Sequence, residues 1–417
     1  MPALRMTAWV VTFRLLLSLN PATAEQVNAH TDELMPDTNM NLHQAVEAAM
    51  IRHPDRDLPQ SVIREAEALS RRGDYLLAAP PSAAVAAYTD RAMDDRGAIE
   101  IEAGLELPLW RLGERATARE LARHADAEAR ASLEVFALRV AGEIRSALWE
   151  LALARTRLQL IRDTLADAEQ RVAAVAQRVE QGDLAQADLL LARNDRLTQH
   201  RKRIKARTEF MRAQRQYRIL TGLDRYPQAF AEQRVDRSTI TVAHPLLAVY
   251  RDRIARARVA TRAARLEAAG RPTLFVGSRR ERGSRNEPYT DAIAVGINLP
   301  FGGSAHRDAA AAQAARAVTE LLAKRNRRQR ELQTQLHEIG RWLEQLAESL
   351  PLAEEQSRIA ERELAMAELA FAHNEMDLID LLKRRTSARK ARQAVAKIRI
   401  EQQYAIAQYN QTVGVTP

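Results

Sequence analysis

The segments EQGDLAQADLL (residues 180–190) and AHNEMDLIDLL (372–382) are two versions of the same helix break. Each interrupts a long helical stretch at a residue that tolerates a left-handed backbone, Gly182 in the first and Asn374 in the second. The two positions are separated by 192 residues, from 182 to 374. We therefore predict that each break is the tight turn of a helical hairpin, and that the hairpin occurs twice.

The same offset relates other segments, which indicates a duplicated unit. Residues 105–108 (LELP) correspond to 297–300 (INLP), and Asp188-Leu189-Leu190 corresponds to Asp380-Leu381-Leu382. Upstream, His53-Pro54 corresponds to His244-Pro245 at an offset of 191. A self-similarity that covers more than a hundred residues without a gap is typical of an internal repeat.

This repeat predicts a division of the chain into four parts. In order, they are a signal peptide over 1–24, repeat 1 over 25–223, a polar linker over 224–243 and repeat 2 over 244–417. Repeat 1 is expected to contain helix 42–78, strands 82–88 and 98–107, long helix 111–181 and helix 184–221. Repeat 2 is expected to contain helix 245–269, strands 273–279 and 291–299, long helix 304–373 and helix 377–413.

Composition favours long helices in a secreted chain. Aromatic residues make up only 5% of the sequence, and the absence of Cys excludes disulfides and thiol chemistry. The N-terminus has a basic start, an apolar run and the small-residue site Ala22-Thr23-Ala24, which predicts a signal peptide cleaved before Glu25. No later segment approaches the roughly 20 consecutive apolar residues of a membrane-spanning helix.

The two long helices carry a coiled-coil pattern. Apolar residues alternate in steps of three and four from Ile144 to Val179, and the pattern recurs from Leu336 to Phe371 with only Ser357 out of place. Such a repeat, sustained over five heptads, predicts neighbouring helices packed along their whole length. Pro351 should kink the second long helix or end one segment of it.

The predicted strands alternate strictly. In residues 98–107, Ile99, Ile101, Ala103, Leu105 and Leu107 share one face, and Glu100, Glu102 and Glu106 share the other. An apolar face of about ten residues suits a tilted membrane strand, but a half-buried hairpin of a soluble domain has the same period. Four strands cannot close a barrel and open edges cannot lie in lipid, so a membrane location requires several chains. Three chains would supply twelve strands.

In this order of elements, the sequence resembles the TolC-type outer-membrane efflux family over essentially the whole mature chain. The resemblance is carried by residues 42–54 (LHQAVEAAMIRHP), by the junctions 105–116 and 297–309, and by the tips 178–192 and 374–388. It implies a mainly α chain whose hairpins form a trimeric α-barrel in the periplasm. It also implies that four strands per chain contribute to a twelve-stranded outer-membrane β-barrel.

The resemblance implies the exit duct of a tripartite efflux system, working with a periplasmic adaptor and an inner-membrane RND pump in a Gram-negative cell. The tip wording GDLAQADLLLA is similar to members that export cobalt, zinc, cadmium or copper. A duct for drug efflux or type I protein secretion shares the architecture and stays open. The family usually has Gly where this chain has Asn374, and Ala370 stands at the position matching Arg178, so the two tips are expected to dock differently.

The tips and the strands supply the candidate functional residues. The resemblance implies that Arg178, Gly182, Asp183, Leu184, Asn374, Glu375 and Met376 contact the adaptor. In a trimer, Asp183, Asp188, Asp377 and Asp380 would form rings of carboxylates at a pore entrance, which favour cations. Glu100, Glu102 and Glu106 would face the barrel lumen.

Each of these assignments has a plainer alternative. Asp183 and Asp377 could cap helices, Asp188 and Asp380 could pair with Arg193 and Arg385, and the three glutamates could be a solvated strand face. The basic stretches 201–218 and 324–330 are interpreted as solvated helix surface, because no nucleic-acid module accompanies them. The scattered histidines fit no zinc-protease pattern, and we expect neither enzyme activity nor a cofactor.

Two other classes of protein share part of this pattern. A periplasmic adaptor carries one hairpin in a small β-rich domain, whereas this chain carries two hairpins and two amphipathic strand pairs. A soluble coiled-coil scaffold would explain the heptads but neither the alternating strands nor the signal segment. The repeat therefore favours the duct.

Overall fold

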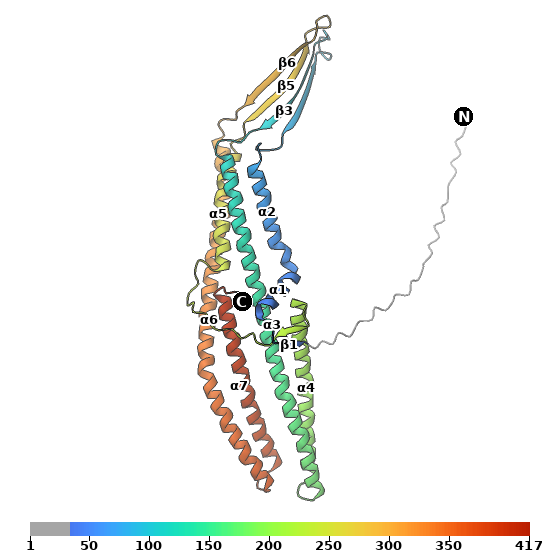
Figure 1. Cartoon of the computed structure of the whole chain (residues 1–417), viewed down its shortest axis with the longest axis vertical. Coiled ribbons are helices and arrows are strands. Elements are labelled where there is room, and N and C mark those ends of the chain that lie inside the picture. The colour runs from blue at the N-terminus through green and yellow to red at the C-terminus, as the bar shows by residue number, and fades with distance from the viewer. Residues whose placement is uncertain (1–33) are drawn as a thin grey trace, which may run out of the picture.

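The computed structural model of the protein describes residues 34–417, in which long helices form a tower with a small sheet at one end (Figure 1). The C-terminus lies near mid-height of the tower (Figure 1). The expected signal peptide, 1–24, lies outside the described residues. Among residues 34–417, none of the helices is both long and apolar enough to span a membrane.

Repeat 1 starts with a helix that breaks where the sequence analysis expected it to continue. In place of one helix over 42–78, the structure has α1 (Leu42–Arg52), the 3-10 turn η1 (Pro54–Arg56) and α2 (Asp57–Asp74). Pro54 disfavours helical backbone at His53, which adopts φ −60° and ψ 134°. The Nδ1 atom of His53 then accepts a hydrogen bond of 3.0 Å from the Asp55 N–H. The remaining elements of repeat 1 are β2 (Ser82–Thr89), β3 (Ile99–Pro108), α3 (Glu114–Glu180) and α4 (Gln186–Thr221).

Repeat 2 has the same order of elements. They are α5 (Pro245–Glu267), β5 (Thr273–Arg282), β6 (Thr290–Asn298), α6 (Ser304–Ala372) and α7 (Leu378–Thr412). The two long helices have 67 and 69 residues. Helix α6 continues through Pro351, so of the two expected effects of this proline, a kink or the end of a helical segment, the second is wrong.

The linker region between the repeats contains a strand that the sequence did not predict. Strand β4 (Arg225–Pro227) pairs in parallel with β1 (Met35–Asp37), which ties the start of the described chain to the linker. Beyond it, buried Arg145 of α3 donates to both carboxylate oxygens of Glu232, at 2.8 and 2.6 Å. Arg145 also donates to Gln411 Oε1 at 2.6 Å and to the Val415 carbonyl at 3.0 Å. One arginine thus connects α3, the linker and the C-terminal segment.

The four long strands form one antiparallel sheet in the order β2-β3-β5-β6, so the two repeats meet at the β3–β5 pair. The register places Gly104 opposite Gly277 and Glu102 opposite Arg279. Because side chains alternate along a strand, one face of the sheet is mostly apolar and the other carries the glutamates of β3.

The helices pack side by side around α3, which contacts α2, α4, α5 and α7, while α6 contacts α5 and α7. The heptad stripe predicted on α3 is buried or half-buried, with Ile144, Leu151, Leu158 and Val175 among its buried residues. Its counterpart on α6 is buried or half-buried from Leu336 to Ala367, and Ser357 is among the buried residues. In the lower half of the tower the hairpin α3–α4 therefore lies beside the hairpin α6–α7, with α4 and α6 on the outer edges (Figure 1).

Candidate functional site at the hairpin tips

The two tips use the same backbone turn. At the first, Gly182 has φ +83°, its N–H donates to the Val179 carbonyl at 3.1 Å, and the Asp183 N–H donates to the Arg178 carbonyl at 2.9 Å. At the second, Asn374 has φ +60°, and Glu375 N–H donates to the Ala370 carbonyl at 2.8 Å. This pair of bonds is the Schellman motif that ends a helix with a left-handed residue. The prediction that Asn374 replaces glycine in this conformation is confirmed.

The tip acids do not make the contacts of the plainer alternative. The N-cap residue of α4 is Ala185, so Asp183 does not cap this helix. The Ala185 N–H donates instead to Asp188 Oδ2 at 3.2 Å. Asp377 stands at the N-cap of α7 without a capping bond from its side chain. Asp380 accepts from Lys383 Nζ at 2.9 Å, not from Arg385, and that contact lowers the pKa of Asp380.

Arg178 joins the two tips. Its guanidinium donates to the Phe371 carbonyl at 3.2 Å and to Asn374 Oδ1, and its Cζ lies 4.9 Å from the centroid of the Phe371 ring. Because Ala370 occupies the matching position in repeat 2, the reverse contact cannot form. We call this set the tip clasp (Arg178, Phe371 and Asn374). Sequence reasoning treated Arg178 and Asn374 as two separate docking positions and missed that they bind each other.

An apolar cluster beside the clasp also contains residues of both hairpins. Val175 and Leu189 come from the first hairpin, and Ala367, Leu378 and Leu381 from the second, all of them buried. The tips are therefore held together by packing and by the clasp. The tip acids Asp183, Glu375 and Asp377 remain exposed.

The glutamates on the polar face of the sheet are partly neutralised by an arginine that the sequence analysis did not single out. Arg279 Nε lies 2.9 Å from Glu100 Oε1 and 3.9 Å from Glu102 Oε1, and Arg279 also contacts Glu281. Glu106 accepts from the Ser82 hydroxyl at 3.3 Å. The Phe275 ring lies over Gly104 and Gly277, where an added Cβ would approach it to within 2.6 and 2.8 Å.

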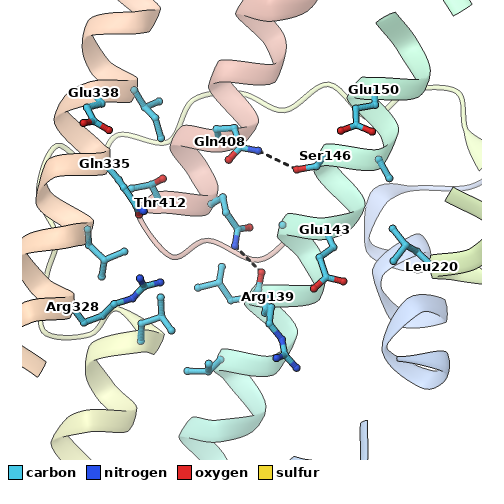
Figure 2. Close-up of a pocket in the computed structure, with 18 of the residues that line it drawn as sticks. Arg139, Glu143, Ser146, Glu150, Leu220, Arg328, Gln335, Glu338, Gln408 and Thr412 are labelled. Atoms are coloured by element: carbon cyan, nitrogen blue, oxygen red, sulfur yellow. Dashed lines mark hydrogen bonds between the residues drawn. The ribbon is translucent and has the colours of Figure 1, made fainter. Parts of the chain in front are cut away.

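A cavity of about 770 Å³ lies at mid-height between α3, α6 and α7 (Figure 2). Amide and charged side chains line it, among them Glu143, Glu150, Arg328, Gln335 and Glu338 (Figure 2). Hydrogen bonds cross its wall from Gln411 Nε2 to the Leu138 carbonyl at 2.8 Å and from Gln408 Nε2 to Ser146 Oγ at 3.4 Å. Within residues 34–417 no cluster of three His, Asp or Glu side chains could hold a metal ion.

The histidines of the two His-Pro pairs serve the helix starts. His244 is buried and repeats the role of His53, because its Nδ1 accepts from the Leu246 N–H at 3.1 Å. Its Nε2 donates to the Thr412 carbonyl at 3.1 Å, which links α5 to the end of α7. Burial lowers the pKa of His244.

Comparisons with known proteins support one fold. No family model and no curated protein matches the sequence. Among solved structures, CusC aligns with a TM-score of 0.74 at 15% identity, over 94% of this chain and 95% of that one. The CmeC outer membrane channel of Campylobacter jejuni aligns with a TM-score of 0.71 at 16% identity, over 99% and 94% of the two chains. The open state of the MtrE outer membrane channel of Neisseria gonorrhoeae aligns with a TM-score of 0.62 at 17% identity, over 92% and 91%.

The chain therefore has the fold of the TolC-type outer-membrane channels, and the resemblance inferred from the sequence is confirmed at the level of the fold. The identities are low, so the comparison establishes the architecture and leaves cargo and partners to be argued from the residues.

Proposed function

We propose that this chain is the outer-membrane exit channel of a tripartite efflux system and that three copies close into one channel. In this arrangement the sheet lies in the outer membrane of a Gram-negative cell and the helices lie in the periplasm. Cargo reaches the channel from an inner-membrane RND pump through a periplasmic adaptor, and it passes without bond chemistry. The fold shared with solved outer membrane channels supports this proposal.

The observation that carries the proposal is a pair of apolar stripes on the outer edges of the helical layer. On α4 the stripe recurs every seven residues at Leu190, Leu197, Ile204 and Met211. On α6 it recurs at the same spacing at Leu352, Ile359 and Met366. These side chains are 40–73% exposed in a single copy. Apolar residues at heptad spacing normally pack against another helix. We therefore expect both α4 and α6 to be covered by a helix of a neighbouring copy.

The two stripes match in height. Leu190 and Met366 each lie eight residues from the turn residue of their own tip, Gly182 or Asn374. Leu197 and Ile359 each lie fifteen residues away, and Ile204 and Leu352 each lie twenty-two. Helix α4 begins at Gln186, four residues after Gly182, and α6 ends at Ala372, two residues before Asn374. Equal counts therefore place the stripes at nearly equal heights, within about two helical rises of roughly 1.5 Å each. The α4 edge of one copy thus fits the α6 edge of the next.

Charge complements this fit. Helix α4 contains ten Lys and Arg against three Asp and Glu. The stretch 341–372 of α6 contains seven Glu against three Arg. A basic edge against an acidic edge favours head-to-tail contact between copies and disfavours contact between like edges. Head-to-tail contacts generate a closed ring when the rotation between copies closes.

The sheet requires the same closure. Its outer strands β2 and β6 have open edges in a single chain, and its apolar face exposes Val85, Ile101, Leu105, Ile293 and Val295. In lipid, unpaired backbone groups cost several kcal/mol each. Three sheets joined β6 to β2 would give twelve strands with that apolar face outward and Glu100, Glu102 and Glu106 inward.

The tips supply the proposed entrance. Three copies of Asp183, Asp188, Asp377 and Asp380 would place twelve carboxylates at one mouth, which favours cations, and heavy-metal cations such as cobalt, zinc, cadmium or copper are the proposed cargo. Arg178, Gly182, Asp183, Leu184, Asn374, Glu375 and Met376 are the proposed adaptor contacts. An adaptor that binds Arg178 must displace the tip clasp.

The closure is tested with cysteine pairs in this cysteine-free chain. Leu197→Cys with Ile359→Cys places the two thiols at the same height on neighbouring copies, and oxidised membranes should yield a covalent trimer on denaturing gels. The matched control, Leu197→Cys with Met366→Cys, is one heptad out of register and should remain monomeric. A trimer from both pairs, or from neither, would contradict the proposed interface.

The cargo is tested in a strain lacking only this chain, by tolerance to zinc, cobalt and cadmium and by cell-associated metal. Loss of tolerance that the reintroduced chain restores would support metal export. Normal metal levels with sensitivity to hydrophobic drugs would keep the channel and replace its cargo. No change in either would favour type I protein secretion.

A further inference from the structure

A small cavity of about 90 Å³ lies in the seam between the two hairpins, above the tips. We call it the seam cavity. Its charged lining residues come from α3 and α7: Asp163, Asp167, Arg171, Arg385, Arg389 and Arg392. Like the stripes, these residues match in height, because Arg171 and Arg385 each lie eleven residues from Gly182 or Asn374. Two guanidinium groups therefore meet at one level of the seam.

Each of these two guanidinium groups is held by an acid of its own hairpin. Arg171 Nη2 donates to Asp195 Oδ2 of α4 at 3.1 Å, and Arg385 Nη2 lies 2.5 Å from Glu368 Oε1 of α6. These contacts fix one edge of each planar group. Among residues 34–417, Arg171 Nη1 and Arg385 Nε are buried and have no hydrogen-bond partner.

Positive charge is concentrated around these unpaired donors. Burial lowers the pKa of Arg385, and the nearby Arg171 lowers it further; the pKa of Arg389 is lowered by the same two causes. Burial and Arg389 also lower the pKa of Lys202 on α4. The exposed residues Asp163 and Asp167 also line the cavity, so four arginines face two aspartates there. Glu368, Asp167 and Asp195 act on the pKa of Arg385 in the opposite direction and raise it, but burial and Arg171 outweigh them.

We propose that the seam cavity binds a small oxyanion, with Arg171 and Arg385 as its hydrogen-bond donors and Arg389 as a third positive charge. Guanidinium groups bind phosphate and carboxylate oxygens through paired N–H donors, and buried donors in proteins nearly always have partners. An oxyanion between the two groups would satisfy donors from α3 and α7 at once. It would therefore tie the first hairpin to the second, independently of the efflux role proposed above.

Inorganic phosphate is the probe for this site. The full chain, purified in detergent, is titrated with phosphate by calorimetry at constant ionic strength, and we expect saturable binding of one phosphate per chain. Arg171→Gln and Arg385→Gln should each weaken binding at least tenfold. Arg385→Lys keeps the positive charge but loses the paired N–H donors of the planar guanidinium, so it should also bind phosphate more weakly than the wild type.

Arg384→Gln is the matched control, because Arg384 is the exposed neighbour of Arg385 and pairs with Glu363 outside the cavity. It should leave phosphate binding unchanged. Sulfate should compete with phosphate, whereas chloride at the same ionic strength should not. Hydrogen exchange should slow in residues 385–393 when phosphate is added to the wild type, and not in Arg385→Gln.

Three results would overturn the site: no saturable binding to the wild type, an equal loss in Arg384→Gln, or equal competition by chloride. Circular dichroism and size-exclusion chromatography establish that each variant is folded. If a glutamine variant does not fold, Arg385→Lys and Arg171→Lys decide the question, and binding as tight as that of the wild type in both would also overturn it.

Discussion

Replacement of Arg145 by Met should release the linker and the C-terminal segment from the middle of the tower. The side chain of Arg145 is fully buried, and its partner Glu232 is 15% exposed. The Arg145→Met change removes two hydrogen bonds to Glu232, one to Gln411 and one to the Val415 carbonyl. It leaves the Glu232 carboxylate in a largely buried position without its counter-charge.

Removal of one partner of a buried ion pair costs about 3–5 kcal/mol, mostly because the remaining charge stays desolvated. At 1.4 kcal/mol per tenfold change, the local opening constant should rise roughly 100- to 4,000-fold. A melting temperature reports the unfolding of the whole chain, so it would respond only weakly to this local opening. Hydrogen exchange of residues 231–237 and 411–415 reports the local opening directly.

Two variants test whether charge burial is the cause. Arg139 of the same helix pairs with Asp55 at 2.9 Å, but both side chains are at least 40% exposed, so Arg139→Met should change exchange by less than about 1 kcal/mol. Arg145→Met combined with Glu232→Leu removes both charges and should exchange more slowly than Arg145→Met alone. Exchange in Arg145→Met within a factor of five of the wild type would refute this reasoning. So would a double variant whose cost equals the sum of the two single costs.

Three further changes have defined outcomes. Arg178→Ala should break the tip clasp, at about 0.5–1 kcal/mol for its contact with the Phe371 ring alone, and speed exchange around Asn374; unchanged exchange would contradict the clasp. Gly182→Ala should cost about 1–2 kcal/mol, because φ is +83° there, whereas Gly340→Ala within α6 should be neutral or stabilising; thermal unfolding compares them. His244 has a lowered pKa in the folded chain, so the unfolded chain binds more protons and the α5–α7 junction should weaken as pH falls below about 6.5. Exchange at 412–414 measures this, and His244→Gln should flatten the pH dependence.

Local patterns were sufficient to predict most of the helices and strands. The heptads from Ile144 to Val179 repeat at the offset of 192, and both tips contain a residue suited to a left-handed turn. The break at His53 was missed, although the matching pair His244-Pro245 marks a helix start in repeat 2. The His53-Pro54 pair could therefore have been read as a helix start in repeat 1 as well. Strands β1 and β4 were missed because three-residue strands show no alternation.

The candidate site was less predictable, because its contacts join residues distant in sequence. Arg178 binds Asn374 across 196 positions, and Arg145 binds Glu232 across 87. Either arginine on its own is indistinguishable from a solvated helix residue in the sequence. The cap expected at Asp183 was wrong for a more local reason. The turn residues after Gly182 delay the start of α4, so Asp188 rather than Asp183 reaches the free N–H group.

The equal counts from the tips also constrain how this chain can diverge. One residue inserted into α4 between Gln186 and Ile204 would rotate everything above it by about 100° and shift it by about 1.5 Å. The apolar stripe of α4 would then no longer face the stripe of α6 on the neighbouring copy. A single insertion in α3 or α7 would likewise separate the arginines that meet at the seam cavity. Relatives of this chain should therefore vary in length in the strand loops 90–98 and 283–289 and in the linker. Between tip and mid-height they should tolerate whole heptads, added to both hairpins together, and little else.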